Sequence, residues 1–183
     1  MTIGLRDLFR APITVNAQGK EEYGTPVRMA KAISADISIE IAEAILYADD
    51  GIDHIERVFV GGELKLNVND LPPTEVATIF GQTTDDDGVI YAGENDEAPY
   101  FAIGFRARKP GGNYRYIWLY KVKFSLPNDG FKTKEGTIEF NTPEITGKII
   151  KRDDGYWKAD HVCKPDDPIA EDWFKNVREK NVA

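Results

Sequence analysis

The sequence predicts a mainly β fold of the α+β kind, a sandwich or barrel with one short flanking helix and a C-terminal helix. Apolar residues recur at every second position in several separate segments, which is the spacing of a strand with one buried face. Turn residues stand between these segments and helical patterns do not alternate with them, which favours a sandwich or barrel. The 183 residues, 42% of them apolar, suffice for a single domain over residues 1–183.

Charge and composition limit the classes of function. The 31 acidic side chains exceed the 23 basic ones, and the net charge of −8 argues against a protein whose main task is to grip nucleic acid phosphates. The single cysteine, Cys163, cannot form an internal disulfide. No long apolar run occurs and the start of the chain is charged, so we expect no membrane segment, no signal peptide, and synthesis in a reducing cytoplasm.

The first third of the chain predicts an arm, a long strand and a loop. Residues 1–26 show little periodicity and are interpreted as an N-terminal arm. Alternation from Val27 to Ile41 exceeds the usual strand length of roughly 5 to 6 residues, so this strand is expected to extend beyond its own core. Residues 47–62 begin at a turn signal, end in two glycines and show only a weak strand pattern. They are interpreted as a long mobile inter-strand loop.

The middle of the chain predicts a strand, a helix and a hairpin. Glu63–Asn69 alternates, and Pro73–Gly81 has helical spacing with proline near the first turn and glycine after the last. Residues 98–127 contain two alternating runs, separated by Pro110, Gly111, Gly112 and Asn113, which predict a β-hairpin. We expect its aromatic face, with Tyr114, Tyr116, Trp118, Tyr120, Val122 and Phe124 on one side, to be core.

The last part of the chain predicts two strands and a helix. The strands lie within residues 137–152 and 156–162, joined by the turn Asp153–Gly155, and Pro143 predicts a bulge or an edge position. Residues 165–183 are interpreted as a C-terminal helical segment, with Asp167 as N-cap, Pro168 in the first turn and an apolar stripe at Ile169, Trp173 and Val177.

Catalysis and metal binding find little support in the motifs. His161 and Cys163 share a strand face, but a structural zinc site needs four ligands. The acidic turns at residues 85–87 and 94–97 could hold calcium, yet neither fits an EF-hand loop, so solvated turns are preferred. No serine occupies a Gly-x-Ser-x-Gly elbow and the glycines at 111–112 do not form a phosphate loop. We therefore expect no enzyme activity, no cofactor and no metal site.

A basic side of the hairpin at residues 98–127 alternates with its aromatic rings. Such a face can stack bases as single-strand binders do, but the negative net charge favours pairing with an acidic surface on another copy of the chain. The candidates for this intersubunit basic face are Arg106, Arg108, Arg115, Lys121 and Lys123.

A succession of segments, in register from about Gly4 to Phe174, resembles major tail proteins of long, non-contractile-tailed phages that infect Gram-positive bacteria. The segments are GLRDLFRAPIT, GTPVRMAKA, LYADDG, GGELKLNVNDLPP, APYFAIGFRARKPGGNYRYIWLYKVKFSLP, KRDDGYWKA and a late WF. The resemblance implies a tail-tube-type β-sandwich that assembles into hexameric rings, stacked head to tail around a channel for phage DNA. It implies a virion protein that is synthesised and assembled in the host cytoplasm.

The same resemblance implies partners and site residues. The expected partners are further copies of the chain, tape measure, tail terminator and baseplate proteins, and passing double-stranded DNA that is not bound specifically. Inter-ring contacts would involve the terminal segments and the loop, with candidates Asp49, Asp50, Asp53, His54, Glu56 and Arg57. A channel lined with carboxylates repels phosphates, and the lumen candidates are Asp36, Ser38, Glu40, Glu63, Asn67, Asn69, Glu139 and Asn141, with Lys65 on the same face.

One alternative of another class is a monomeric ligand-binding β-sandwich, such as a carbohydrate-binding module. Trp118, Trp157 and several tyrosines suggest it, provided that these aromatic side chains form a surface platform. An enzyme that uses the acidic clusters with a metal is a third reading, which the absence of a recognisable ligand set disfavours.

Overall fold

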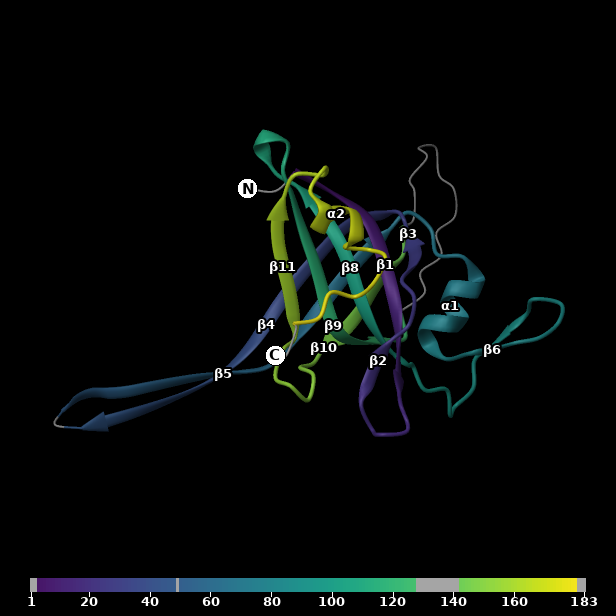
Figure 1. Ribbon diagram of the computed structural model, residues 1–183. Coiled ribbons are helices and arrows are strands. Elements are labelled where there is room, and N and C mark those ends of the chain that lie inside the picture. Colours follow the sequence, from purple (N-terminus) through teal and green to yellow (C-terminus); the bar gives the residue numbers. More distant parts are fainter. Residues whose placement is uncertain (1–2, 49, 128–141, 181–183) are drawn as a thin grey trace, which may run out of the picture.

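The computed structural model describes residues 3–48, 50–127 and 142–180 (Figure 1). The predicted mainly β fold is confirmed. The helices are α1 (Pro73–Phe80) and α2 (Pro168–Asp172), and a short 3₁₀ turn spans Pro110–Gly112. The strands are β1 (Ile3–Val15), β2 (Glu21–Tyr23), β3 (Val27–Ala30), β4 (Ala32–Ala48), β5 (Gly51–Val68), β6 (Thr83–Thr84), β7 (Ile90–Tyr91), β8 (Tyr100–Arg108), β9 (Tyr114–Ser125), β10 (Glu144–Ile149) and β11 (Lys158–Cys163).

One antiparallel sheet forms the body, in the order β2-β1-β8-β9-β10-β5-β4. Strand β3 pairs with β1 and is separated from β4 by Lys31 alone, so the sheet closes on itself into a barrel. Strand β9 changes partner along its length: its first half pairs with β11 and its second half with β10. Strand β4 ends the order, so within the described residues one of its edges pairs with no other strand.

The inner core lies inside the curved sheet. Its side chains come from β1, β3, β5, β8, β9, β10 and α1, and Leu64, Leu66 and Val68 of β5 are fully buried. Helix α1 adds Ile79 and Phe80. Gly81 ends this helix in the left-handed conformation, as the sequence predicts. Burial of these apolar side chains accounts for most of the favourable free energy of folding.

A second core lies on the outer face of β8 and β9, beneath the C-terminal segment. Trp118 is fully buried there, and its indole N–H donates to the carbonyl oxygen of Trp173 over 2.9 Å. Asp167 caps α2 by accepting from the amide of Ile169, as predicted. The predicted helical segment 165–183 contains only the five-residue helix α2 in its described part, and the chain beyond it is held by Trp173 and Val177.

The predicted N-terminal arm, residues 1–26, is wrong. Strand β1 lies inside the sheet, where it pairs with β2, β3 and β8. Its side chains Leu8 and Ala11 are fully buried. Two register shifts interrupt β1, and Gly4 and Asp7 have positive φ values of 75° and 56°. These irregularities break the period-2 pattern by which a strand is recognised in a sequence.

The predicted loop at residues 47–62 is also wrong. Residues 51–62 belong to β5, which pairs with β4 along its whole length. Register shifts lie between Glu40 and Ile41 and between Leu46 and Tyr47. Each shift moves the apolar residues from even-numbered to odd-numbered positions or back. The alternation therefore looks weak although the strand is continuous.

The hairpin at residues 98–127 is confirmed as β8 and β9, but its single aromatic face is wrong. Tyr116 and Trp118 point to the outer core, whereas Val122 and Phe124 point to the inner core. The register shifts between Phe101 and Ile103 in the pairing with β9. Because β9 is covered on both faces, aromatic and aliphatic side chains occupy both its odd-numbered and its even-numbered positions.

Candidate assembly surfaces

The outermost part of the β4–β5 pair, residues 41–60, projects away from the barrel as a two-stranded ribbon (Figure 1). We call these residues the outer hairpin. Its exposed large apolar side chains are Ile41, Ile45, Leu46, Tyr47, Ile52, Ile55, Val58 and Val60. A two-stranded ribbon with no core of its own is marginally stable in water. Exposed apolar surface of this kind is typical of sites that contact another protein or a membrane.

The base of the outer hairpin is fixed to the barrel. The ring of Phe59 stacks on that of Trp157, with centroids 4.8 Å apart and planes 4° from parallel. At Gly62 a β-carbon would lie 2.7 Å from the carbonyl oxygen of Ser38 on the paired strand. The chain therefore passes from barrel to ribbon through a close-packed junction that fixes the direction of the ribbon.

The inter-ring candidates lie on this ribbon, except Asp49, which is outside the described residues. Asp50 has a positive φ of 62° at the turn. Arg57 forms an ion pair with Glu43 across the strands, and both side chains are exposed. Asp53, His54 and Glu56 are likewise exposed. The structure thus gathers the described candidates on a strand pair, where the sequence had predicted a mobile loop.

A polar face crosses four strands of the barrel. The cross-strand register aligns Asp36 of β4 with Lys65 of β5 and Thr146 of β10, which is paired with Ser125 of β9. The next such row includes Ser38, Glu63, Lys148 and Lys123. These side chains lie on the side of the sheet opposite to the inner core, which Leu64 and Leu66 face.

Five of the lumen candidates share this polar face: Asp36, Ser38, Glu40, Glu63 and Asn67. Asn69 follows the end of β5 and instead accepts a hydrogen bond from the amide of Lys31 over 3.2 Å, and Glu139 and Asn141 lie outside the described residues. The sequence interpretation missed Glu144, Thr146 and Lys148 of β10, which the register of β10 with β5 brings to the same face.

The polar face carries both signs of charge. Lys148 donates to Glu40 over 2.9 Å and Lys123 donates to Glu97 over 2.7 Å. These hydrogen bonds raise the pKa of both lysines and lower the pKa of Glu97. The face, counted with Glu97, holds the carboxylates Asp36, Glu40, Glu63, Glu97 and Glu144 and the lysines Lys65, Lys123 and Lys148. It is mildly acidic rather than a uniform wall of carboxylates.

The predicted intersubunit basic face is wrong as a single surface. Arg115 lies on the inner-core side of β9, whereas Arg106 lies over the rings of Tyr114 and Tyr116 on the outer side. The cations also have partners within the chain: Arg106 pairs with Asp7, Arg115 with Asp160, Lys121 with Glu21 and Lys123 with Glu97. Arg108 is exposed at the end of β8, and no ion pair is described for it.

One end of the barrel opens into an apolar groove of about 340 Å³. Its lining includes Leu5, Ile33, Ile37, Phe105, Ile117 and Arg115. A second hollow shares Leu5 with this groove and is lined by Arg6, Arg28, Lys31 and Arg106, with Asp7 among them. We call the two together the end groove. The first hollow is lined mainly by apolar side chains and the second mainly by charged ones, of which Arg28 and Arg106 pair with Asp7.

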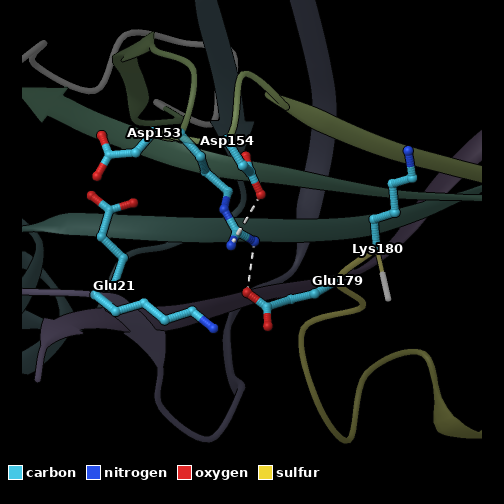
Figure 2. A pocket seen from close by; sticks show the side chains of 7 residues that line it. Glu21, Asp153, Asp154, Glu179 and Lys180 are labelled. Atoms are coloured by element: carbon cyan, nitrogen blue, oxygen red, sulfur yellow. Dashed lines mark hydrogen bonds and ion pairs between the residues drawn. The ribbon is translucent and has the colours of Figure 1, made fainter. Parts of the chain in front are cut away.

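A larger hollow of about 490 Å³ lies beside the C-terminal segment and is lined mainly by charged side chains (Figure 2). Arg152 is paired there with Asp154 and Glu179, and its guanidinium lies over the rings of both Tyr23 and Tyr120. Burial raises the pKa of both tyrosines, so they remain neutral phenols. The ion pair of Arg152 with Glu179 attaches the C-terminal segment to the sheet.

Several of the residues considered for metal binding have structural roles. Asp85 accepts hydrogen bonds from the amides of Asp87 and Val89 and from the hydroxyl of Tyr91. The ring of His161 stacks on that of Trp173, and Cys163 is buried. Within residues 3–48, 50–127 and 142–180, no three His, Cys, Asp or Glu side chains converge as a metal site. In the same residues no helix is long and apolar enough to cross a membrane.

Comparison of the chain with models of known protein families gave no match, and comparison with curated proteins gave none either.

Proposed function

We propose that this chain is a structural subunit of a phage tail tube, which self-assembles into stacked hexameric rings and has no catalytic activity. The rings would form the conduit for DNA ejection into the host, within a virion whose tail is long and non-contractile. Tape measure, tail terminator and baseplate proteins would be its other partners. The proposal combines the sequence resemblance with the surfaces described above.

The observation that carries the proposal is the outer hairpin. It spreads eight large exposed apolar side chains over both faces of a ribbon that lies away from the barrel. An exposed apolar ribbon on an isolated molecule promotes uncontrolled association. A ribbon received by an identical neighbour is covered, and a repeated head-to-tail contact of this kind builds rings and tubes.

Two features of the barrel support the same proposal. Among the residues that the structure describes, one edge of β4 pairs with no other strand, and a neighbouring copy could complete its backbone groups. The polar face of β4, β5, β10 and β9 has a mildly acidic charge balance. Facing a channel, it would let a duplex pass without the counterion release that drives tight binding to phosphates.

The alternative of a ligand-binding sandwich needs an aromatic platform at the surface. Trp118 and Trp173 are buried, at 0% and 4% exposure. Trp157 is partly buried in its stack on Phe59. No tryptophan is therefore a flat exposed platform, and we do not favour this alternative.

Shortening the outer hairpin tests the proposed function. Ala42 and Val58 are cross-strand partners, so residues 43–57 can be replaced by Asn-Gly, which favours a two-residue hairpin turn. Phe59 and its stack on Trp157 are kept. We expect the full chain to form rings or tubes at high concentration in negative-stain images, and the shortened chain to fail to stack into tubes while keeping a similar melting temperature. A full chain that stays monomeric at every concentration would refute the proposal.

A further inference from the structure

We propose that the second hollow of the end groove is a binding site for an anion that carries two or more linked phosphate groups. This hollow measures about 280 Å³, and its charged lining consists of Arg6, Arg28, Lys31 and Arg106 with Asp7 among them. We call it the basic hollow. Its cations come from β1, β3, β8 and the residue that follows β3. The polar face belongs to other strands, so the inference is independent of the proposed self-assembly.

The basic hollow has an excess of positive charge. Four cations line it together with one carboxylate, in a chain whose net charge is −8. Both oxygens of Asp7 are already paired, Oδ1 with Arg28 at 3.2 Å and Oδ2 with Arg106 at 2.6 Å. Arg6 and Lys31 form no ion pair with the residues that the structure describes. A concave surface lined by one sign of charge concentrates ions of the opposite sign, here anions.

Two of the charged side chains are fixed before any ligand binds. The guanidinium of Arg106 donates to Asp7 and lies over the rings of Tyr114 and Tyr116, 4.8 and 5.9 Å from their centroids. Neighbouring residues of a regular strand point to opposite faces, yet Asp7 reaches Arg106, the cross-strand partner of Arg6. The positive φ of Asp7, at a register shift of β1, makes this possible. Strained positions of this kind gather at ligand sites.

Charge and size indicate the class of anion. Guanidinium groups bind carboxylates and phosphates through paired hydrogen bonds. An excess of three positive charges favours an anion with several negative charges over a single carboxylate. The volume of about 280 Å³ is several times the roughly 30 Å³ of one water molecule, so more than one tetrahedral group fits. Linked phosphates meet both conditions, either as inorganic pyrophosphate or as the phosphate chain of a nucleotide.

Calorimetric titration of the monomeric chain with pyrophosphate, without divalent cations and at constant ionic strength, tests the inference. Arg6→Gln with Lys31→Gln removes the two exposed cations that lack a described partner. We expect this variant to bind pyrophosphate at least about tenfold more weakly, because hydrogen bonds to charged groups are lost. Lys20→Gln with Lys151→Gln is the matched control: it removes the same charge from exposed side chains outside the basic hollow and should leave the affinity unchanged.

Further titrations identify the source of the phosphates. ATP that binds at least tenfold more tightly than pyrophosphate would assign the site to a nucleotide, whereas equal affinities would assign it to the phosphate chain alone. The exchange Arg6→Lys with Lys31→Arg keeps both charges and should retain binding, and melting temperatures of all variants check their folding.

Three results would overturn the basic hollow as a phosphate site. These are no binding of pyrophosphate by the unchanged chain, an equal loss of affinity in the matched control, and equally tight binding of citrate, which carries carboxylates only. None of them bears on tube formation, which the negative-stain images of the full chain test separately.

Discussion

The inner and outer halves of the β4–β5 pair have the same backbone pairing but opposite surroundings. In the inner half, residues 32–40 with 61–68, Leu64 and Leu66 are fully buried and the polar side chains face outward. In the outer half, residues 41–60, apolar side chains on both faces are exposed. The ladder of hydrogen bonds continues through both halves.

This difference shows that the two halves depend on different sources of stability. Hydrogen bonds contribute little net free energy, because water can replace them. The inner half is stabilised by burial within its own chain, whereas in the part of the chain that the structure describes the outer half shows such burial only at the stack of Phe59 on Trp157. The apolar content of the outer half is therefore better explained by contact with another molecule than by folding of the monomer.

Matched leucine substitutions should separate the halves most strongly. Leu64→Ala removes a fully buried side chain from the inner core, and we expect it to lower the free energy of unfolding by about 3 kcal/mol. Leu46→Ala truncates a side chain that is 58% exposed, and we expect a change below about 0.5 kcal/mol. Urea unfolding of the two variants as monomers measures both values.

The same pair should reverse its order in assembly. Leu46→Ala should weaken ring formation although the monomer keeps its stability, while Leu64→Ala should assemble once the temperature is low enough for it to fold. Equal destabilisation of the monomer by both substitutions would show that the outer hairpin belongs to the core, and the distinction between the halves would fail.

The junction between the halves should be sensitive to a single methyl group. At Gly62 a β-carbon would lie 2.7 Å from the backbone oxygen of Ser38 and 3.4 Å from Cδ1 of Ile149. Because backbone cannot move aside as a flexible side chain does, we expect Gly62→Ala to cost about 1–3 kcal/mol. Gly61→Ala is the control, since its closest contact is 3.3 Å. A smaller loss in the control would confirm that the boundary is close-packed at Gly62, whereas equal effects would argue against it.

Sequence periodicity identified the segments of the barrel in which alternation is uninterrupted. Leu64, Leu66 and Val68 alternate as predicted and are all buried. Strand β1 escaped recognition because Gly4 and Asp7 place it in the left-handed region at two points, which breaks its period. The outer part of β5 escaped for a related reason, the register shifts that move its apolar residues from one parity to the other.

The candidate surfaces were less predictable, because they depend on which strands become neighbours. Asp36 and Ser38 could be placed on one face of their strand from alternation alone, whereas Glu63 joins that face through the pairing of β4 with β5. Lys148 and Glu144 join them only through the pairing of β10 with β5, which the sequence does not encode locally. The end groove combines β1, β4, β8 and β9, so no local pattern could reveal it.

The smallest expected effect concerns acid and again contrasts the barrel with the outer hairpin. In the barrel, Arg115 donates to both carboxylate oxygens of Asp160, over 2.9 and 3.0 Å, and Lys158 donates over 3.1 Å. The pKa of Asp160 lies below its usual range, mainly because its carboxylate accepts hydrogen bonds from Arg115. A depressed pKa means that this stabilisation is present above the unfolded pKa of about 3.9 and is lost as the pH falls through the folded pKa.

Asp160→Asn should therefore lower the melting temperature at pH 7, by less than Gly62→Ala, and the difference from the unchanged chain should shrink as the pH is lowered below about 4. In the outer hairpin, Glu43→Gln removes one partner of an exposed pair with Arg57. Exposed pairs contribute little, so this control should have almost the same melting temperature as the unchanged chain at both pH values. If the loss of melting temperature in Asp160→Asn stays constant with pH, the carboxylate acts by packing and not by its charge. If only Glu43→Gln shows a pH-dependent change in melting temperature, the charge-dependent stability lies in the outer hairpin and not in the barrel.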